Sequence, residues 1–84
     1  MTGNDKHLLG RVCSVVARTF NVQAAEVTAD SGPANLTAWD SLGHLTLMME
    51  IEKEFRVRFA TEQIAKPRSV RDICLLLRSV LPNG

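Results

Sequence analysis

The 84-residue chain contains no tyrosine, one tryptophan and two cysteines, and it carries almost no net charge. A formal charge of +1 excludes the strongly basic surface that binds nucleic acid regardless of its sequence. The cysteines, Cys13 and Cys74, lie in different segments and lack the paired spacing and flanking histidine that a zinc or redox site needs. We therefore expect no metal site and interpret both thiols as small buried apolar residues.

Long hydrophobic runs are also missing. No apolar stretch approaches the roughly 18 residues of a membrane span, and the first residues lack the cationic and apolar regions of a secretory signal. These features predict a cytoplasmic protein with no membrane partner. A chain of this length forms one domain, residues 1–84, and buries only about 60% of its unfolded surface. Little structure is left for an enclosed active site, so we do not expect an enzyme.

Hydrophobic residues recur at helical spacing in three segments. The predicted long helices cover about residues 5–19, residues 41–55 after the N-cap Asp40, and a last segment that Ser69 caps and whose apolar stripe reaches Leu81. Thr61 is expected to cap a short helix that ends before Pro67. The predicted fold is therefore all-α, a small four-helix bundle with three longer helices and a short third helix.

Residues 21–40 show no sustained period and are predicted to form a long loop between the first two helices. Such a long connection is uncommon in a compact domain and is usually functional. Four apolar side chains are expected to attach it to the core: Val22, Val27, Leu36 and Trp39. An extended linker with Val57 and Phe59 turned inward is expected after the second long helix.

The helix over residues 41–55 has the clearest pattern. An advance of about 100° per residue places one set of apolar side chains on a broad face that should be buried. These side chains are Leu45, Leu47, Met48, Ile51 and Phe55. Leu42 and Met49 fall on the rim of that face, and Glu50 and Glu54 are expected to pair with Lys53 or Arg58 on the surface.

Ser41 and His44 are candidates for chemistry. Their spacing of three residues permits a Ser–His contact, but Asp40 and Ser41 are consecutive and point apart, and no third group orients the imidazole. We therefore prefer a partly buried, hydrogen-bonded His44 to a small hydrolase. Ser41 lies in the first helical turn, where free N–H groups favour an attached anion such as a phosphodiester. Helix physics alone favours an ordinary first-turn serine beside the N-cap, and the surrounding sequence decides between the two interpretations.

The segment Trp-Asp-Ser-Leu-Gly-His-Leu at residues 39–45, followed by an amphipathic helix that ends in Glu-Lys-Glu-Phe, resembles the acyl carrier protein family at its phosphopantetheine attachment site. The resemblance extends from about Leu8 to Leu81. It implies that Ser41 receives 4′-phosphopantetheine from coenzyme A and holds acyl or aminoacyl groups as thioesters. Asp40 and Leu42 match the motif positions on either side of the serine.

The resemblance also implies a non-catalytic, monomeric carrier acted on by separate enzymes. The expected partners are a phosphopantetheinyl transferase, an acyl- or aminoacyl-loading enzyme, and a ketosynthase or other synthase enzymes. Partner contact is expected on a surface formed by Leu42, Gly43, Thr46, Met49 and Lys53.

This surface departs from one branch of the family. Carriers of bacterial fatty acid synthesis usually have acidic residues at the positions of Gly43 and Thr46, and Lys53 adds a positive charge here. The more neutral helix looks most like that of free-standing carriers in specialised polyketide or nonribosomal peptide pathways. An aminoacyl or peptidyl carrier, and an unmodified interaction module that keeps only the fold, are the alternatives.

The charges are unevenly divided along the chain. Residues 1–54 carry four basic and seven acidic residues, whereas residues 55–84 carry six basic and two acidic residues. The second half lacks a clear recognition helix, which disfavours a DNA-binding module. Its excess positive charge is interpreted as a solvated surface, with a docking face for an acidic partner as the alternative.

Overall fold

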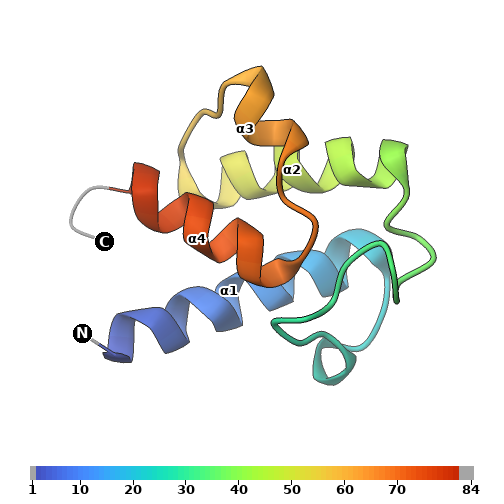
Figure 1. Ribbon diagram of the computed structural model, residues 1–84. Coiled ribbons are helices and arrows are strands. Elements are labelled where there is room, and N and C mark those ends of the chain that lie inside the picture. Colours follow the sequence, from blue (N-terminus) through green and yellow to red (C-terminus); the bar gives the residue numbers. More distant parts are fainter. Residues whose placement is uncertain (1, 82–84) are drawn as a thin grey trace.

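The computed structural model describes residues 2–81, with side chains from residue 7 onward. Its α-helices are α1 (Thr2–Phe20), α2 (Ser41–Phe55), α3 (Thr61–Ala65) and α4 (Val70–Val80), and a short 3₁₀ turn, η1, spans Ala24–Glu26. No strand occurs within residues 2–81. The predicted all-α bundle with a short third helix is confirmed (Figure 1).

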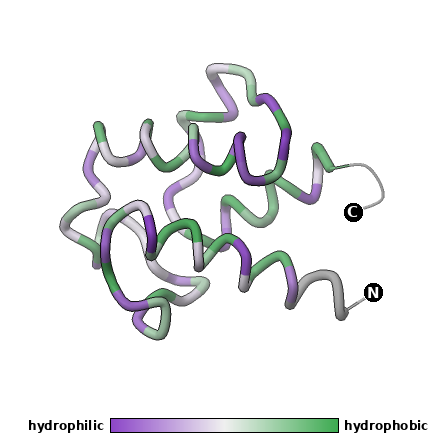
Figure 2. Tube along the Cα trace, turned by 180° about the vertical axis from the view of Figure 1, so that it is seen from behind, coloured by the Kyte–Doolittle hydropathy of each residue, from purple (hydrophilic) through white to green (hydrophobic). Residues whose placement is uncertain are grey.

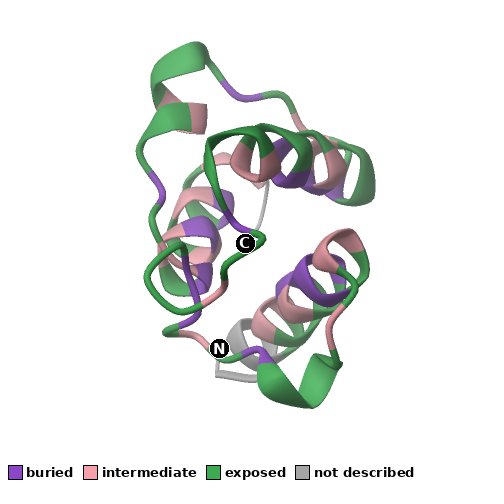
Figure 3. Ribbon diagram, turned by 90° about the vertical axis from the view of Figure 1, so that its right-hand side faces the viewer, coloured by how far each residue is buried: buried purple, intermediate pink, exposed green. Residues whose placement is uncertain are grey.

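The helix α1 lies at the centre of the packing, because α2, α4 and η1 all contact it. The helix α3 lies at the edge of the molecule, on the chain segment that leads from α2 to α4 (Figure 1). It contains no buried residue, and Figure 3 shows its surface as mainly exposed. The bundle is therefore three packed helices with a fourth, small helix at its periphery.

The core is formed where the apolar faces of the three long helices meet, and hydrophobic and hydrophilic stretches alternate along their traces as this requires (Figure 2). Each helix contributes three fully buried aliphatic or methionine side chains: Val12, Val15 and Val16; Leu47, Met48 and Ile51; Val70, Ile73 and Leu77. Both Val57 and Phe59 in the linker pack against this cluster, as expected.

The long loop is attached to the core as predicted. Val27 and Trp39 are buried, and Val22 and Leu36 pack against the core while partly exposed. The turn η1 was not predicted, since three residues are too few to show a helical period. The first helix also begins at Thr2 rather than near Asp5, a difference typical of helix ends.

Hydrogen bonds connect this loop to the start of α4. The N–H groups of Val70 and Arg71 donate to the carbonyl oxygens of Ser31 and Ala29, each at 2.9 Å. The Arg71 guanidinium also pairs with the carboxylate of Asp30. The first and second halves of the chain are thus joined directly by backbone contacts.

The predicted cap of α3 is wrong. Ala60 is the N-cap, and Thr61 is already helical. Alanine has no side-chain oxygen to cap the helix, but the side chain of Gln63 reaches back, and its Oε1 accepts the N–H of Ala60 at 2.7 Å. The predicted cap of α4 is confirmed, since Ser69 Oγ accepts the N–H of Asp72 at 3.1 Å.

The predicted burial of Leu45 is also wrong. Its residue exposure is 52%, whereas its neighbour Leu47 is fully buried. The prediction from helical periodicity assumes that the whole apolar face of the helix packs against another part of the chain. Here the side of α2 that carries Leu45 faces the small α3, which leaves a groove rather than a filled interface.

The two cysteines are half-buried and are not joined in a disulfide, so the expected burial is only partial. Burial raises the pKa of the Cys13 thiol above its usual value. Within residues 2–81, no group of three or more histidine, cysteine or acidic side chains could hold a metal ion.

Candidate functional site

The start of α2 is fixed by Asp40. Its Oδ1 accepts the N–H of Gly43 at 2.8 Å, and its carbonyl oxygen accepts the N–H of His44 at 2.7 Å. The predicted N-cap is therefore confirmed. The cap satisfies one of the backbone donors that a helix start leaves unpaired and places Ser41 as the first helical residue.

Ser41 is exposed, and its hydroxyl makes no hydrogen bond to any residue from 7 to 81. The first turn of α2 contains no acidic side chain, and the neighbouring carboxylate of the N-cap Asp40 is engaged by the N–H of Gly43. The positive end of the helix dipole also favours negative charge at this position. The site thus offers a free hydroxyl where an attached phosphate is electrostatically acceptable.

Gly43 lies where the loop touches α2. A Cβ at this position would be 2.4 Å from the carbonyl oxygen of Ala38 and 3.0 Å from Cε1 of Phe20. Neither atom belongs to a freely moving group, so a side chain does not fit without displacing the loop. Glycine is therefore the residue that fits this contact with the loop as it lies.

His44 connects three parts of the molecule. Its Nδ1 accepts the indole N–H of Trp39 at 2.9 Å, and its Nε2 lies 2.7 Å from the carbonyl oxygen of Ile64 in α3. An indole only donates and a carbonyl only accepts, so these partners assign the proton of the neutral ring to Nε2. The preferred interpretation of His44 as a partly buried, hydrogen-bonded residue is confirmed.

This arrangement provides no Ser–His pair. Both ring nitrogens of His44 are occupied by Trp39 and Ile64, and none of the hydrogen bonds involves Ser41. A hydrolase would need the imidazole to accept the serine proton. The structure therefore gives the hydrolase hypothesis no support.

A groove of about 580 Å³ opens beside Ser41, between the start of α2 and α3. Trp39 and His44 line it next to the serine, and apolar side chains form much of the remainder, including Leu45, Ile64 and Pro67. Sequence reasoning missed this groove, because it depends on where α3 lies.

Three large apolar side chains are exposed along α2: Leu42 (74%), Leu45 (52%) and Met49 (58%). They follow at intervals of three and four residues, so they form one row along the helix, here called the apolar row. The rim positions predicted for Leu42 and Met49 agree with this exposure. Of the other predicted surface residues, Thr46 and Lys53 are exposed, while Gly43 is half-buried.

The carboxylates of α2 pair mostly with α1. Arg11 lies 3.4 Å from Glu54, and Arg18 lies 3.8 Å from both Glu50 and Glu54. The predicted Glu50–Lys53 pair is present at 3.5 Å. Arg58, the alternative partner, pairs with neither carboxylate, because α1 supplies the nearer cations.

A capped helix that presents a free serine at its start, on a small four-helix bundle, is the architecture of a carrier domain. The chain is similar to curated acyl carrier proteins of three bacteria. It is 36% identical to that of Porphyromonas gingivalis over 62 residues, which cover 74% of this chain and 80% of the relative. The chain therefore belongs to the acyl carrier protein family.

Two further relatives agree with this assignment. Identity is 36% over 63 residues with the acyl carrier protein of Rickettsia bellii, covering 75% of this chain and 73% of the relative. The identity with the acyl carrier protein of Prochlorococcus marinus is 32% over 59 residues, which cover 70% of this chain and 74% of the relative. No protein-family model matches the chain. None of the helices within residues 2–81 is long and apolar enough to cross a membrane.

Proposed function

We propose that Ser41 carries 4′-phosphopantetheine and that the protein holds acyl groups on it as thioesters for separate synthase enzymes. The observation that carries this proposal is the exposed, unbonded hydroxyl of Ser41 at the capped start of α2, in a chain of the acyl carrier protein family. Asp40 and Leu42 flank it as in the attachment motif.

The residues at the site suit this attachment. In the transfer, Ser41 Oγ attacks the β-phosphorus of coenzyme A and forms a P–O bond. The bond between the two phosphates breaks, adenosine 3′,5′-bisphosphate leaves, and the hydroxyl proton passes to a base of the transferase. Asp40 holds the first helical turn, and the positive helix end stabilises the phosphodiester that results. The terminal thiol of the bound group then supplies the thioester.

The pathway belongs to the proposal as well. The neutral surface around Gly43 and Thr46 supports specialised metabolism, with polyketide assembly as the leading context. The partners would be a phosphopantetheinyl transferase, a loading enzyme and a ketosynthase or other synthase enzyme, and the carrier would act as a cytoplasmic monomer. An aminoacyl or peptidyl carrier of a nonribosomal peptide pathway is the alternative within the same chemistry.

The attachment is tested by incubating the protein with coenzyme A, Mg²⁺ and a broad-specificity phosphopantetheinyl transferase. Intact-protein mass spectrometry should show the addition of one phosphopantetheine, and fragmentation should locate it on Ser41. Ser41→Ala should remain unmodified, while Ser14→Ala, which alters an exposed serine of α1, should load like the wild type. An unmodified wild-type chain with several transferases would contradict the proposal and favour the unmodified interaction module.

A further inference from the structure

The acidic side chains of α2 are engaged in contacts within the chain. Glu50 and Glu54 pair with cations of α1 at 3.4 to 3.8 Å. Glu52 Oε2 accepts the N–H of Phe59 at 2.8 Å, which ties the carboxylate to the linker after the helix. Of the three carboxylates of α2, Glu50 and Glu54 are ion-paired within the chain, whereas Glu52 is held by a backbone N–H and has no cation partner among the described residues.

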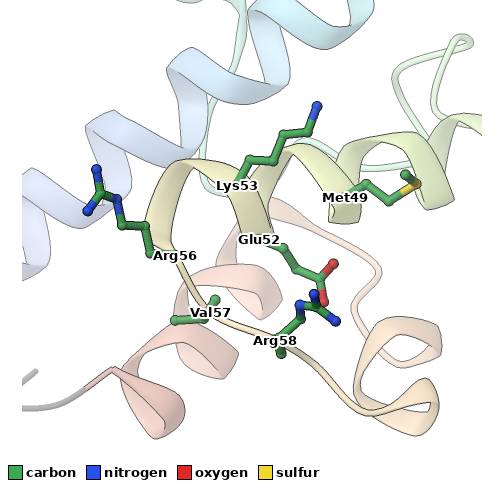
Figure 4. A pocket seen from close by; sticks show the side chains of 6 residues that line it. All are labelled: Met49, Glu52, Lys53, Arg56, Val57 and Arg58. Carbon is green, nitrogen blue, oxygen red and sulfur yellow. The ribbon is translucent and has the colours of Figure 1, made fainter.

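Cationic side chains gather at the end of α2, and two of them have no partner among the described residues. A shallow hollow of about 480 Å³ is lined there by Met49, Glu52, Lys53, Arg56, Val57 and Arg58, and is called here the basic hollow. Figure 4 shows Lys53, Arg56 and Arg58 projecting in different directions around it. Lys53 pairs with Glu50 at 3.5 Å, but neither arginine side chain makes an ion pair or hydrogen bond with a described residue.

The position of Arg56 is unusual for a long side chain. It is the C-cap of α2 and has a φ of 56°, in the left-handed region where glycine has no steric cost. A cation near a helix C-terminus complements the helix dipole, which gives Lys53 and Arg56 a structural role. Arg58 lies three residues beyond the helix, where the dipole does not explain its charge.

The basic hollow adjoins the apolar row. Met49 belongs to both, and the row leads from Met49 through Leu45 to Leu42, next to Ser41. We propose that the apolar row and the basic hollow form one docking surface for a partner protein that presents acidic side chains beside an apolar contact. This inference rests on the proposed function, because the partner would be an enzyme acting on the group carried by Ser41.

Charge complementarity determines the kind of partner. Like charges brought together at an interface are strongly unfavourable, so a partner with a basic contact surface would be rejected at Arg56 and Arg58. An acidic partner would gain two unpaired guanidinium groups that can bind carboxylates in a bidentate manner. Because the hollow is open to solvent, this attraction should weaken as the salt concentration rises.

The test uses two helical peptides of 15 residues as probes. Both carry the same row of leucines, flanked by glutamates in one and by lysines in the other. Amide chemical shifts of the isotope-labelled, unmodified protein report the binding site and the affinity. The acidic peptide should shift amides along residues 42–58 and bind at least about tenfold more tightly than the basic peptide.

Charge reversal then locates the contact. The double variant Arg56→Glu/Arg58→Glu should weaken the acidic peptide about tenfold. The matched control Lys66→Glu/Arg78→Glu makes the same change in net charge at exposed positions outside the apolar row and the basic hollow and should leave the affinity nearly unchanged. Circular dichroism confirms that both variants are folded.

Several results would overturn the inference. These are equal or tighter binding of the basic peptide, no binding of either peptide, or equal loss of affinity in both double variants. In a separate measurement, binding to vesicles that contain phosphatidylglycerol is compared with binding to the acidic peptide. If they bind the protein more strongly than the acidic peptide and are released by Arg56→Glu/Arg58→Glu, the surface serves a lipid rather than a protein. Because the unmodified protein is used, failure of this test is distinct from failure to load Ser41.

Discussion

At the scale of single residues, Gly43 shows how packing determines a position that the sequence presents as surface. The carbonyl of Ala38 and the ring of Phe20 occupy the space that a side chain would need. The end of the long loop can therefore lie directly against the first turn of α2. The position that follows the Asp-Ser-Leu motif is thus constrained by the fold, whatever its role in partner contact.

We expect Gly43→Ala to lower the free energy of unfolding by about 1–3 kcal/mol, because the added methyl group displaces the loop backbone. Gly10→Ala is the matched control. Its Cβ would meet no atom within 4 Å, and alanine favours an exposed helix position, so stability should rise by up to about 1 kcal/mol. Denaturant unfolding measures both changes. Equal stability of the two variants would show that the loop yields freely at position 43.

At the scale of elements, α3 is the least supported helix. It has five residues and no buried side chain, and a helix this short is unstable by itself in water. Ile64 packs partly against the core, and its carbonyl oxygen is bonded to His44. His44 therefore fixes the position of α3 relative to α2 and so shapes the groove beside Ser41.

His44→Ala should free α3. The variant loses the bond to Ile64 and leaves the buried indole N–H of Trp39 without its acceptor, which should cost about 1–3 kcal/mol. Hydrogen exchange should accelerate most at the backbone amides of α3 and of residues 66–69, where local opening requires least energy. His7→Ala, at an exposed position of α1, is the control and should leave both quantities unchanged. Uniform acceleration over all helices would instead indicate general destabilisation.

The features that could be predicted from the sequence are those determined by neighbouring residues, and the features that could not depend on contacts between distant segments. The helices, Asp40 as a cap and Ser41 as the first helical residue follow from periodicity and capping chemistry, which act over a few residues. The exposure of Leu45 and the bond of His44 to Ile64 do not, because both depend on where α3 comes to lie, about 20 residues along the chain. The same limit explains why α1, and not Arg58, pairs with the carboxylates of α2.

At the scale of the whole molecule, the long loop acts as a connector between the two halves of the chain. Its carbonyl groups at Ala29 and Ser31 accept the first N–H groups of α4, and Val27 and Trp39 enter the core. Ser31 is buried, and its Oγ accepts the N–H of Thr28 at 2.9 Å. A loop held at so many points should unfold together with the helices.

We therefore expect Ser31→Ala to lower stability by about 1–2 kcal/mol while unfolding remains a single transition. Circular dichroism, which reports the helices, and the emission of Trp39, which reports the loop, should give the same midpoint in denaturant. Ser14→Ala should leave that midpoint in place. Separate midpoints for the two signals would mean that the loop unfolds independently of the bundle.

The half-buried thiol of Cys13 bears on the thioester chemistry proposed for Ser41. A thioester can be lost to any nearby thiolate, since the thiolate and not the thiol is the attacking species. Burial raises the pKa of Cys13, so this sulfur stays protonated at neutral pH and is a poor acceptor. A carrier loaded at Ser41 would thereby be less prone to transfer its cargo to Cys13, a transfer that would trap an intermediate beyond the reach of the next enzyme.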